Sequence, residues 1–112
     1  MAKKEVSICN EKLIVIVQDK YEVYEKSLPA GIDPDINWLG NFGIKEMKTG
    51  KKLNGKVPKY EIQTPDVAGK KLFYWNGSEK KEVPGQKTIT KKNKKFRVGE
   101  LDLGDPPIGL DR

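Results

Sequence analysis

Histidine is absent from this chain of 112 residues, and cysteine occurs only once, as Cys9. The lack of histidine excludes histidine-based catalytic triads and metal sites, and it removes the commonest general base. A single cysteine excludes an intramolecular disulfide and a thiolate zinc site within the chain. Cys9 ends the alternating stretch EVSIC, so we interpret it as a small buried apolar residue and not as a reactive thiol.

Carboxylates are the catalytic groups that remain. Two of them can carry out glycosidase chemistry, and carboxylate oxygens are also ligands that calcium prefers. Asp33 and Asp35 are the nearest candidates, with Asp105 as a further calcium ligand, but the first two flank a proline and lack EF-hand spacing. Aspartate beside proline is typical of a turn. We therefore predict that the protein is not an enzyme and has no catalytic, cofactor-binding or metal-binding residues.

Alanine and long apolar runs are also scarce. Three alanines stand against seventeen valines and isoleucines, whose branched side chains favour strands over helices. The longest apolar run is Leu13 to Val17, far shorter than the roughly 20 residues of a membrane helix. The N-terminal stretch MAKKEVSICNEK does not resemble a signal peptide. We therefore expect no helix bundle, no membrane insertion and a cytoplasmic location by default, with a virion as the alternative.

Short alternating or β-branched stretches follow one another along the chain. EVSIC and KYEIQT alternate, KLIVIV indicates a central strand covered on both faces, and YEVYEK fits either a strand or a helical turn. Two hairpins are predicted, one turning through Asn76-Gly77 and one through Lys92-Asn93-Lys94. This spacing predicts an all-β single domain over residues 1–112 with about seven short strands. The domain is either an antiparallel β-sandwich, Ig-like in general architecture, or a small barrel.

Two segments lack strand patterning. Residues 27–43 contain two prolines and three glycines, so we predict a long loop there. A loop of this length in a compact domain usually carries function or packs its own apolar side chains. Residues 104–112 contain paired prolines and are predicted to form an extended tail after the last strand.

The stretch FYWNGSEKKEV resembles, in its pattern, hairpins of bacterial and phage β-sandwich modules. In a strand, Phe73 and Trp75 point to one side while Leu72 and Tyr74 point to the other. We expect Phe73 and Trp75 to face the core. Tyr74, and Trp38 of the long loop, are then the candidate aromatic residues for stacking on a ligand.

The net charge of +6 is unevenly distributed, with −2 over residues 1–36, +11 over 37–99 and −3 over 100–112. Six cations and no acid lie between residues 87 and 97. A hairpin there could follow an anionic partner such as a nucleic-acid backbone, with mostly lysine contacts and little sequence preference. We favour the other interpretation, in which the lysines solvate an exposed sheet edge and Phe96, which shares a face with Val98, points into the core. The candidate anion-binding residues are Lys91, Lys92, Lys94, Lys95 and Arg97.

These observations favour a non-enzymatic β-sandwich module with a structural or protein-binding role. We expect it to be a component of a larger assembly, such as a phage virion or a cell surface, and to contact a protein partner or itself through edge strands. The alternative hypothesis is a sequence-tolerant nucleic-acid-binding domain that uses the basic hairpin 87–97.

Overall fold

The computed structural model describes residues 2–104 and 106–111, and this part of the chain contains no helix. No helix of the described residues could therefore cross a membrane. The described residues form eleven strands, more than the sequence predicted, and the ambiguous stretch YEVYEK is one of them. Their bounds are β1 Lys3–Ile8, β2 Leu13–Gln18, β3 Tyr21–Lys26, β4 Ile36–Glu46, β5 Lys52–Leu53, β6 Lys56–Pro65, β7 Leu72–Trp75, β8 Lys80–Glu82, β9 Lys87–Lys91, β10 Lys94–Leu103 and β11 Pro107–Asp111.

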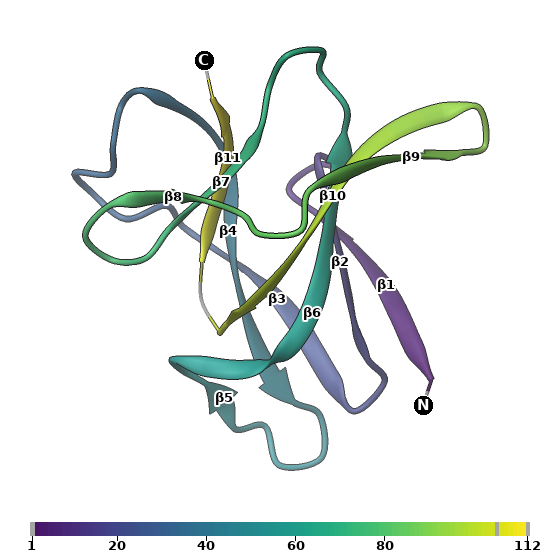
Figure 1. Ribbon diagram of the computed structural model, residues 1–112. Coiled ribbons are helices and arrows are strands. Elements are labelled where there is room, and N and C mark those ends of the chain that lie inside the picture. The colour runs from purple at the N-terminus through teal and green to yellow at the C-terminus, as the bar shows by residue number, and fades with distance from the viewer. Residues whose placement is uncertain (1, 105, 112) are drawn as a thin grey trace.

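The strands form two antiparallel sheets that pack against each other (Figure 1). The first sheet has the order β1-β2-β6-β10-β9. The second has the order β3-β4-β11-β7-β8, with β5 paired to β4. The all-β prediction is confirmed, and of the two architectures predicted the β-sandwich is the one that forms.

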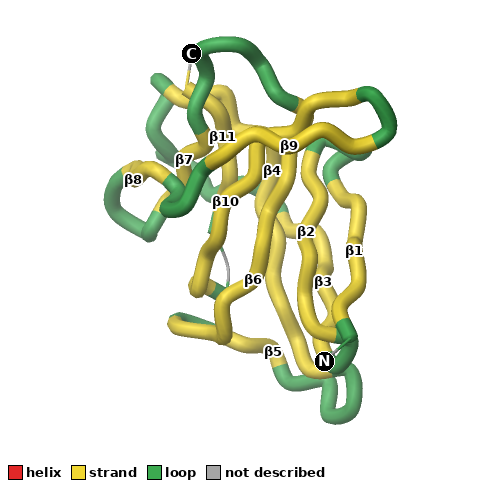
Figure 2. Tube along the Cα trace, turned by 45° about the vertical axis from the view of Figure 1, so that its right-hand side comes forward, coloured by secondary structure: helices red, strands yellow, loops and turns green. Residues whose placement is uncertain are grey.

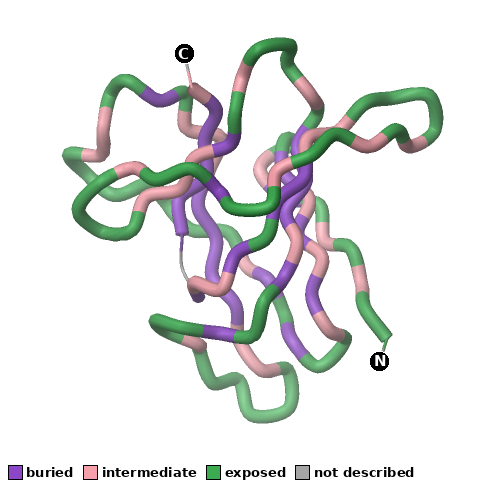
Figure 3. The backbone as a smooth tube through the Cα atoms, in the orientation of Figure 1, coloured by how far each residue is buried: buried purple, intermediate pink, exposed green. Residues whose placement is uncertain are grey.

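The core lies between the sheets and follows the alternation of the strands. In β2, Leu13, Val15 and Val17 are at most 3 % exposed, whereas Ile14 and Ile16 are half-buried on the outer face. The stretch KLIVIV is therefore fully covered on one face only, and not on both as predicted. Figure 3 shows the buried segments running along the inner strands, while the turns that join them are mostly exposed.

Both predicted hairpins are present, with different turns. The hairpin of β7 and β8 has a four-residue loop over 76–79, in which Gly77 has a positive φ of 106° and Asn76 does not. The hairpin of β9 and β10 has a two-residue turn, with Lys92 at a φ of 48° and Asn93 at 66°. Positive φ at both central residues is the type I′ geometry that matches the twist of the flanking strands.

The predicted loop over residues 27–43 is correct only for 27–35, because the remainder belongs to the long strand β4. Glycine usually signals a loop, but a strand also uses it where another group approaches closely. The ring of Tyr24 lies over Gly43, so close that a Cβ at Gly43 would overlap it. The glycines that obscured the strand pattern are therefore packing positions.

Within the predicted extended tail over 104–112, residues 107–111 form an interior strand. β11 lies between β4 and β7 in the second sheet, and its Ile108 is completely buried. Pro107 is its first residue, a position that tolerates the missing N–H. Extension was correctly expected from the paired prolines, but the central place of this strand depends on pairing with segments far away in the sequence.

Candidate binding surfaces

β7 carries the three consecutive aromatic residues, and its two faces are the reverse of those predicted. Leu72 is fully buried in the core and Tyr74 packs against the core. Because side chains alternate, Phe73 and Trp75 point to the outer face of the second sheet. The predicted inward orientation of Phe73 and Trp75 is therefore wrong. Alternation establishes only that Phe73 and Trp75 lie on the face opposite to Leu72 and Tyr74. Tyr74 lies next to the buried Ile108 of β11 in the sheet, and this neighbour shows which face is inward.

A bulge in β4 brings Trp38 to the same outer face. Gly40 and Trp38 pair with successive residues of β11, so Leu39 between them has no partner of its own. The bulge shifts the alternation, and Trp38 then closes over Gly109 together with Ile36, leaving no room for a Cβ there. Trp38 therefore lies in a strand, and not in a loop as predicted.

The outer aromatic cluster consists of Trp38, Phe73 and Trp75. The Trp38 and Trp75 rings meet edge to face, with centroids 6.2 Å apart and planes at 88°. The loop 27–35 is held over this cluster, because the Trp38 Nε1–H donates to the carbonyl of Asp33 at 2.7 Å. The Lys80 ammonium lies 5.9 Å from the Phe73 ring centroid and 3.8 Å from the Asp33 carboxylate. These contacts make the cluster a second, smaller hydrophobic unit outside the main core.

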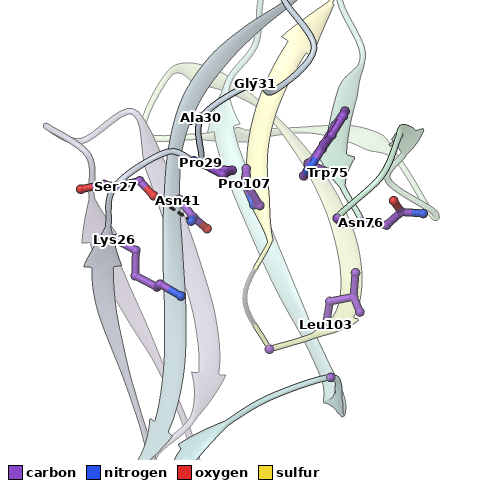
Figure 4. Close-up of a pocket in the computed structure, with 13 residues that line it drawn as sticks. Lys26, Ser27, Pro29, Ala30, Gly31, Asn41, Trp75, Asn76, Leu103 and Pro107 are labelled. Carbon is purple, nitrogen blue, oxygen red and sulfur yellow. Dashed lines mark hydrogen bonds between the residues drawn. The ribbon is translucent and has the colours of Figure 1, made fainter.

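A cleft of about 630 Å³ opens beside this cluster (Figure 4). Asn41 and Pro107 form its floor, and the loop 27–35 and the turn after β7 form its walls. The Asn41 amide donates to the carbonyl of Ser27 at 3.1 Å, which ties the loop to the floor. Trp75 lines the cleft, with the nitrogen end of its indole directed toward it in Figure 4. The volume is within the range of small-molecule sites.

Neither aromatic residue predicted to stack on a ligand lines this cleft. Tyr74 packs against the core, and the Trp38 ring is already in contact with Trp75. Ligand stacking on either one stays a prediction. Trp75 was not among the residues predicted to contact a ligand. The FYW run was the only sequence signal for it, and that run does not show whether Trp75 points inward or outward.

The basic hairpin formed by β9 and β10 projects from the body of the sandwich (Figure 2). Lys92, Lys94 and Lys95 are exposed on it, and none of the described carboxylates contacts them. The two other predicted anion-binding residues are engaged. Lys91 Nζ lies 2.7 Å from Glu5 and donates to Gln63 at 3.0 Å.

Arg97 is the second engaged cation, on the inner side of the hairpin. Its Nε lies 3.5 Å from the Asp66 carboxylate, and the two side chains are only 20 % and 16 % exposed. Neither atom has a hydrogen-bond partner at this contact, so the pair interacts electrostatically and not through a hydrogen bond. A second nitrogen of Arg97 donates to Gln86 at 3.3 Å. Of the five cations predicted to bind an anion, three are therefore open to an anionic partner.

The predicted inward orientation of Phe96 is wrong. The inner side of β10 carries Leu101 in the core and Gly99, whose Cβ position is occupied by Val83. By alternation, Phe96 and Val98 lie on the outer face of the first sheet. There Val98 is 2 % exposed, and the Lys91 ammonium lies 5.5 Å from the Phe96 ring centroid. A cation of its own chain therefore lies over one face of the half-buried Phe96 ring.

Cys9 lies in the turn between β1 and β2, where it and the next two residues all have positive φ. Its sulfur packs directly against Gly40 of the other sheet, where it occupies the space of a Cβ. Its backbone N–H donates to the Glu25 carboxylate at 2.7 Å. Burial, and next the charge of Glu25, raise the pKa of the Cys9 thiol above its ordinary value. Cys9 is half-buried, and not fully buried as predicted, but its raised pKa disfavours the reactive thiolate.

The aspartates considered for calcium are used within a turn. Asp33 accepts a hydrogen bond from the backbone N–H of Asp35 at 2.8 Å, and its carboxylate also faces Lys80. Asp105 lies outside the described residues. Within 2–104 and 106–111, no three acidic or cysteine side chains gather as a metal site would require.

Comparison with known proteins finds no relative. No protein-family model matches the chain, and neither a curated protein nor a solved structure matches it.

Proposed function

We propose that this protein is a non-enzymatic β-sandwich module that binds a protein partner as part of a larger assembly, such as a phage virion or a cell surface. One observation carries this proposal: β9 is the outermost strand of the first sheet and belongs to a hairpin that projects from the sandwich (Figure 1). An open edge strand offers backbone donors and acceptors to an added strand, which is a common mode of peptide recognition.

The register of the hairpin indicates which backbone groups of β9 are open. The carbonyl of Lys95 accepts a hydrogen bond from the backbone N–H of Asp66, on the side of β10 that faces β6. Lys95 pairs with Thr90, and Arg97 pairs with Thr88. Because antiparallel pairs alternate between bonded and non-bonded, the N–H and C=O groups of Thr90 and Thr88 point away from β10. Both threonines are exposed.

The other edges are less suited to adding a strand. β8 has only three residues. β1 and β3 form the edges on the opposite side of the sandwich, and they contact each other there. β9 has five residues without proline, and its described neighbour in the sheet is β10.

A capture experiment with an edge-blocked variant tests this function. Thr88→Pro removes a donor that points outward and not a bond of the hairpin, so the fold should be retained. Thr88→Val keeps the backbone donor and is the matched control. In a nuclease-treated extract of the source cells, the wild-type protein and Thr88→Val should retain the same partner, and Thr88→Pro should lose it. Retention of no protein, together with a monomeric state by light scattering, would contradict the proposal.

A nucleic-acid-binding function is the second candidate, and the three exposed lysines of the hairpin favour it. Phosphate contacts by Lys92, Lys94 and Lys95 alone would be tolerant of sequence. For single strands, three such contacts correspond to a slope of about −2 in a plot of log affinity against log salt. A mobility-shift assay at low salt tests this, and the triple replacement of these lysines by glutamine should abolish any shift. Absence of a shift with every probe removes this candidate.

A further inference from the structure

We infer that the open edge of β9 takes an acidic, extended strand from a different chain, and not a second copy of this protein. This inference rests on the proposed protein-binding function and specifies the partner of the same surface.

The charge around the edge selects an acidic partner. Lys87, Lys92, Lys94 and Lys95 surround β9 and are exposed, and no described carboxylate contacts any of them. Glu5 is already paired with Lys91 and Asp66 with Arg97, and the two acids of β10 lie beyond Val98, outside the part of that strand that pairs with β9. A strand that approaches this edge therefore meets uncompensated positive charge, which favours carboxylates and repels cations.

The same charge disfavours pairing of β9 with itself. A two-fold antiparallel pairing that uses the open groups of both Thr88 and Thr90 is centred on Ile89. In that register Lys87 of each copy lies directly opposite Lys91 of the other. Like charges directly opposite each other destabilise an antiparallel pair. Because Lys91 is paired with Glu5, most of the repulsion comes from the exposed lysines that both copies bring to the same edge. Edge lysines are also a common means by which proteins avoid edge-to-edge association.

The side chains of β9 specify a pattern for the added strand. Lys87, Ile89 and Lys91 share one face of the strand, while Thr88 and Thr90 share the other. An acidic residue opposite the exposed Lys87 and an apolar β-branched residue opposite Ile89 would pair favourably. Lys91 is already engaged by Glu5, so a second acidic residue at that end of the added strand would be attracted by the exposed Lys92 next to it. The residues between these positions would exchange backbone hydrogen bonds with the threonines. The expected ligand pattern is acidic, any, apolar, any, acidic.

The contacts of the hairpin favour a protein strand over nucleic acid. A base that stacks on Phe96 would compete with the Lys91 ammonium, which lies 5.5 Å from the centroid of this half-buried ring. Bidentate recognition of phosphate or guanine needs an open guanidinium, but Arg97 is held between Asp66 and Gln86. The open backbone groups of Thr88 and Thr90 supply what an added strand uses.

Peptide titration followed by NMR tests the inference on the whole chain. The probe is a capped peptide with the core Glu-Thr-Ile-Thr-Glu, and the matched control carries Lys-Thr-Ile-Thr-Lys, the sequence of β9 itself. With millimolar glutamate peptide, the amide signals of Thr88 and Thr90 should shift and their hydrogen exchange should slow. Added salt should reduce the effect, and the lysine peptide should produce none. Equal responses to both peptides, or shifts away from β9, would overturn the inference.

Variants of the protein distinguish the contribution of the backbone hydrogen bonds of β9 from the contribution of the lysine charges. Thr88→Pro should abolish the response while Thr88→Val retains it, and replacement of Lys87, Lys92, Lys94 and Lys95 by glutamine should weaken peptide binding about tenfold. Unchanged thermal midpoints verify that the variants are folded.

The other outcomes of these experiments distinguish failure of the acidic-strand inference from failure of the protein-binding function. If the extract partner is retained by Thr88→Val and lost by Thr88→Pro but the glutamate peptide gives no response, the protein-binding function stands and the acidic-strand inference fails. If a single-stranded oligonucleotide shifts the hairpin signals and the peptide does not, the hairpin binds nucleic acid instead. A dimer in light scattering that Thr88→Pro dissociates would show self-pairing and overturn the inference.

Discussion

Trp75 meets Trp38 edge to face, with ring centroids 6.2 Å apart and ring planes at 88°. The two rings come from β7 and β4, which are not neighbours, because β11 lies between them in the sheet. Gly109 of β11 makes this contact possible, since a side chain there would collide with Trp38. The pair therefore joins three strands on the outer face, and through Trp38 it also holds the loop 27–35.

Truncation of Trp75 should test this connection. Trp75→Ala should lower the free energy of unfolding by about 2 kcal/mol, less than a fully buried tryptophan, because the ring is half-buried. Trp75→Phe should lower it less, since a ring remains beside Trp38. Denaturant unfolding measures both, and the near-ultraviolet circular dichroism of the tryptophan pair should disappear in both variants. Equal stability of Trp75→Ala and the wild type would contradict the role of the cluster.

The contact between Cys9 and Gly40 should make a methyl group at position 40 costly. Gly40→Ala should destabilise the protein by about 1–3 kcal/mol, because the added Cβ would overlap the Cys9 sulfur. In the background of Cys9→Ala the sulfur is gone, and the same substitution should cost clearly less. A double-mutant cycle by chemical unfolding measures the difference. Strict additivity of the two substitutions would refute the contact.

The ion pair of Arg97 and Asp66 should contribute to stability more than the exposed lysines of the same hairpin. Arg97→Gln should cost about 1–2 kcal/mol, since it leaves the Asp66 carboxylate partly buried without its cation. Lys94→Gln is the control on the same strand, and its effect should stay within about 0.5 kcal/mol. Thermal or urea unfolding of the two variants provides the comparison, and equal losses would contradict the assignment.

The thiol of Cys9 should react slowly at neutral pH. Burial and the Glu25 carboxylate raise its pKa, so the thiolate that attacks an alkylating reagent is rarer than in the unfolded chain. Glu25→Gln should lower the pKa and speed alkylation by iodoacetamide, measured as a pH–rate profile. The folded state holds this proton more tightly than the unfolded chain does. The free energy of unfolding should therefore fall as the pH rises from the ordinary pKa of cysteine through the raised pKa of Cys9. A profile identical to that of the unfolded chain would contradict the burial of Cys9.

Local patterns in the chain were sufficient for the all-β class and the two hairpins, while the choice between a sandwich and a small barrel was left open until the sheets were seen to pack. β-branched alternation and turn residues act over one to four positions, and the residues that produce them are adjacent in the sequence. The same locality explains the errors in the predicted loop and tail. In the sequence, Gly40 and Gly43 indicate a loop. In the folded chain they are strand residues, because Cys9 and Tyr24 fill the space above them.

The inner face of β7, the place of Trp38 and the number of open lysines were decided by contacts between distant segments. β11 pairs with β7 so that Leu72 and Tyr74 face the core, and a bulge opposite β11 turns Trp38 outward. Glu5, 86 positions away from Lys91 along the chain, engages that lysine. A period of two gives each strand two faces but does not say which one is buried, because that choice depends on the surface it meets when the sheets pack. The sequence likewise shows how many cations the hairpin carries, but only the folded structure shows which of them already have a partner.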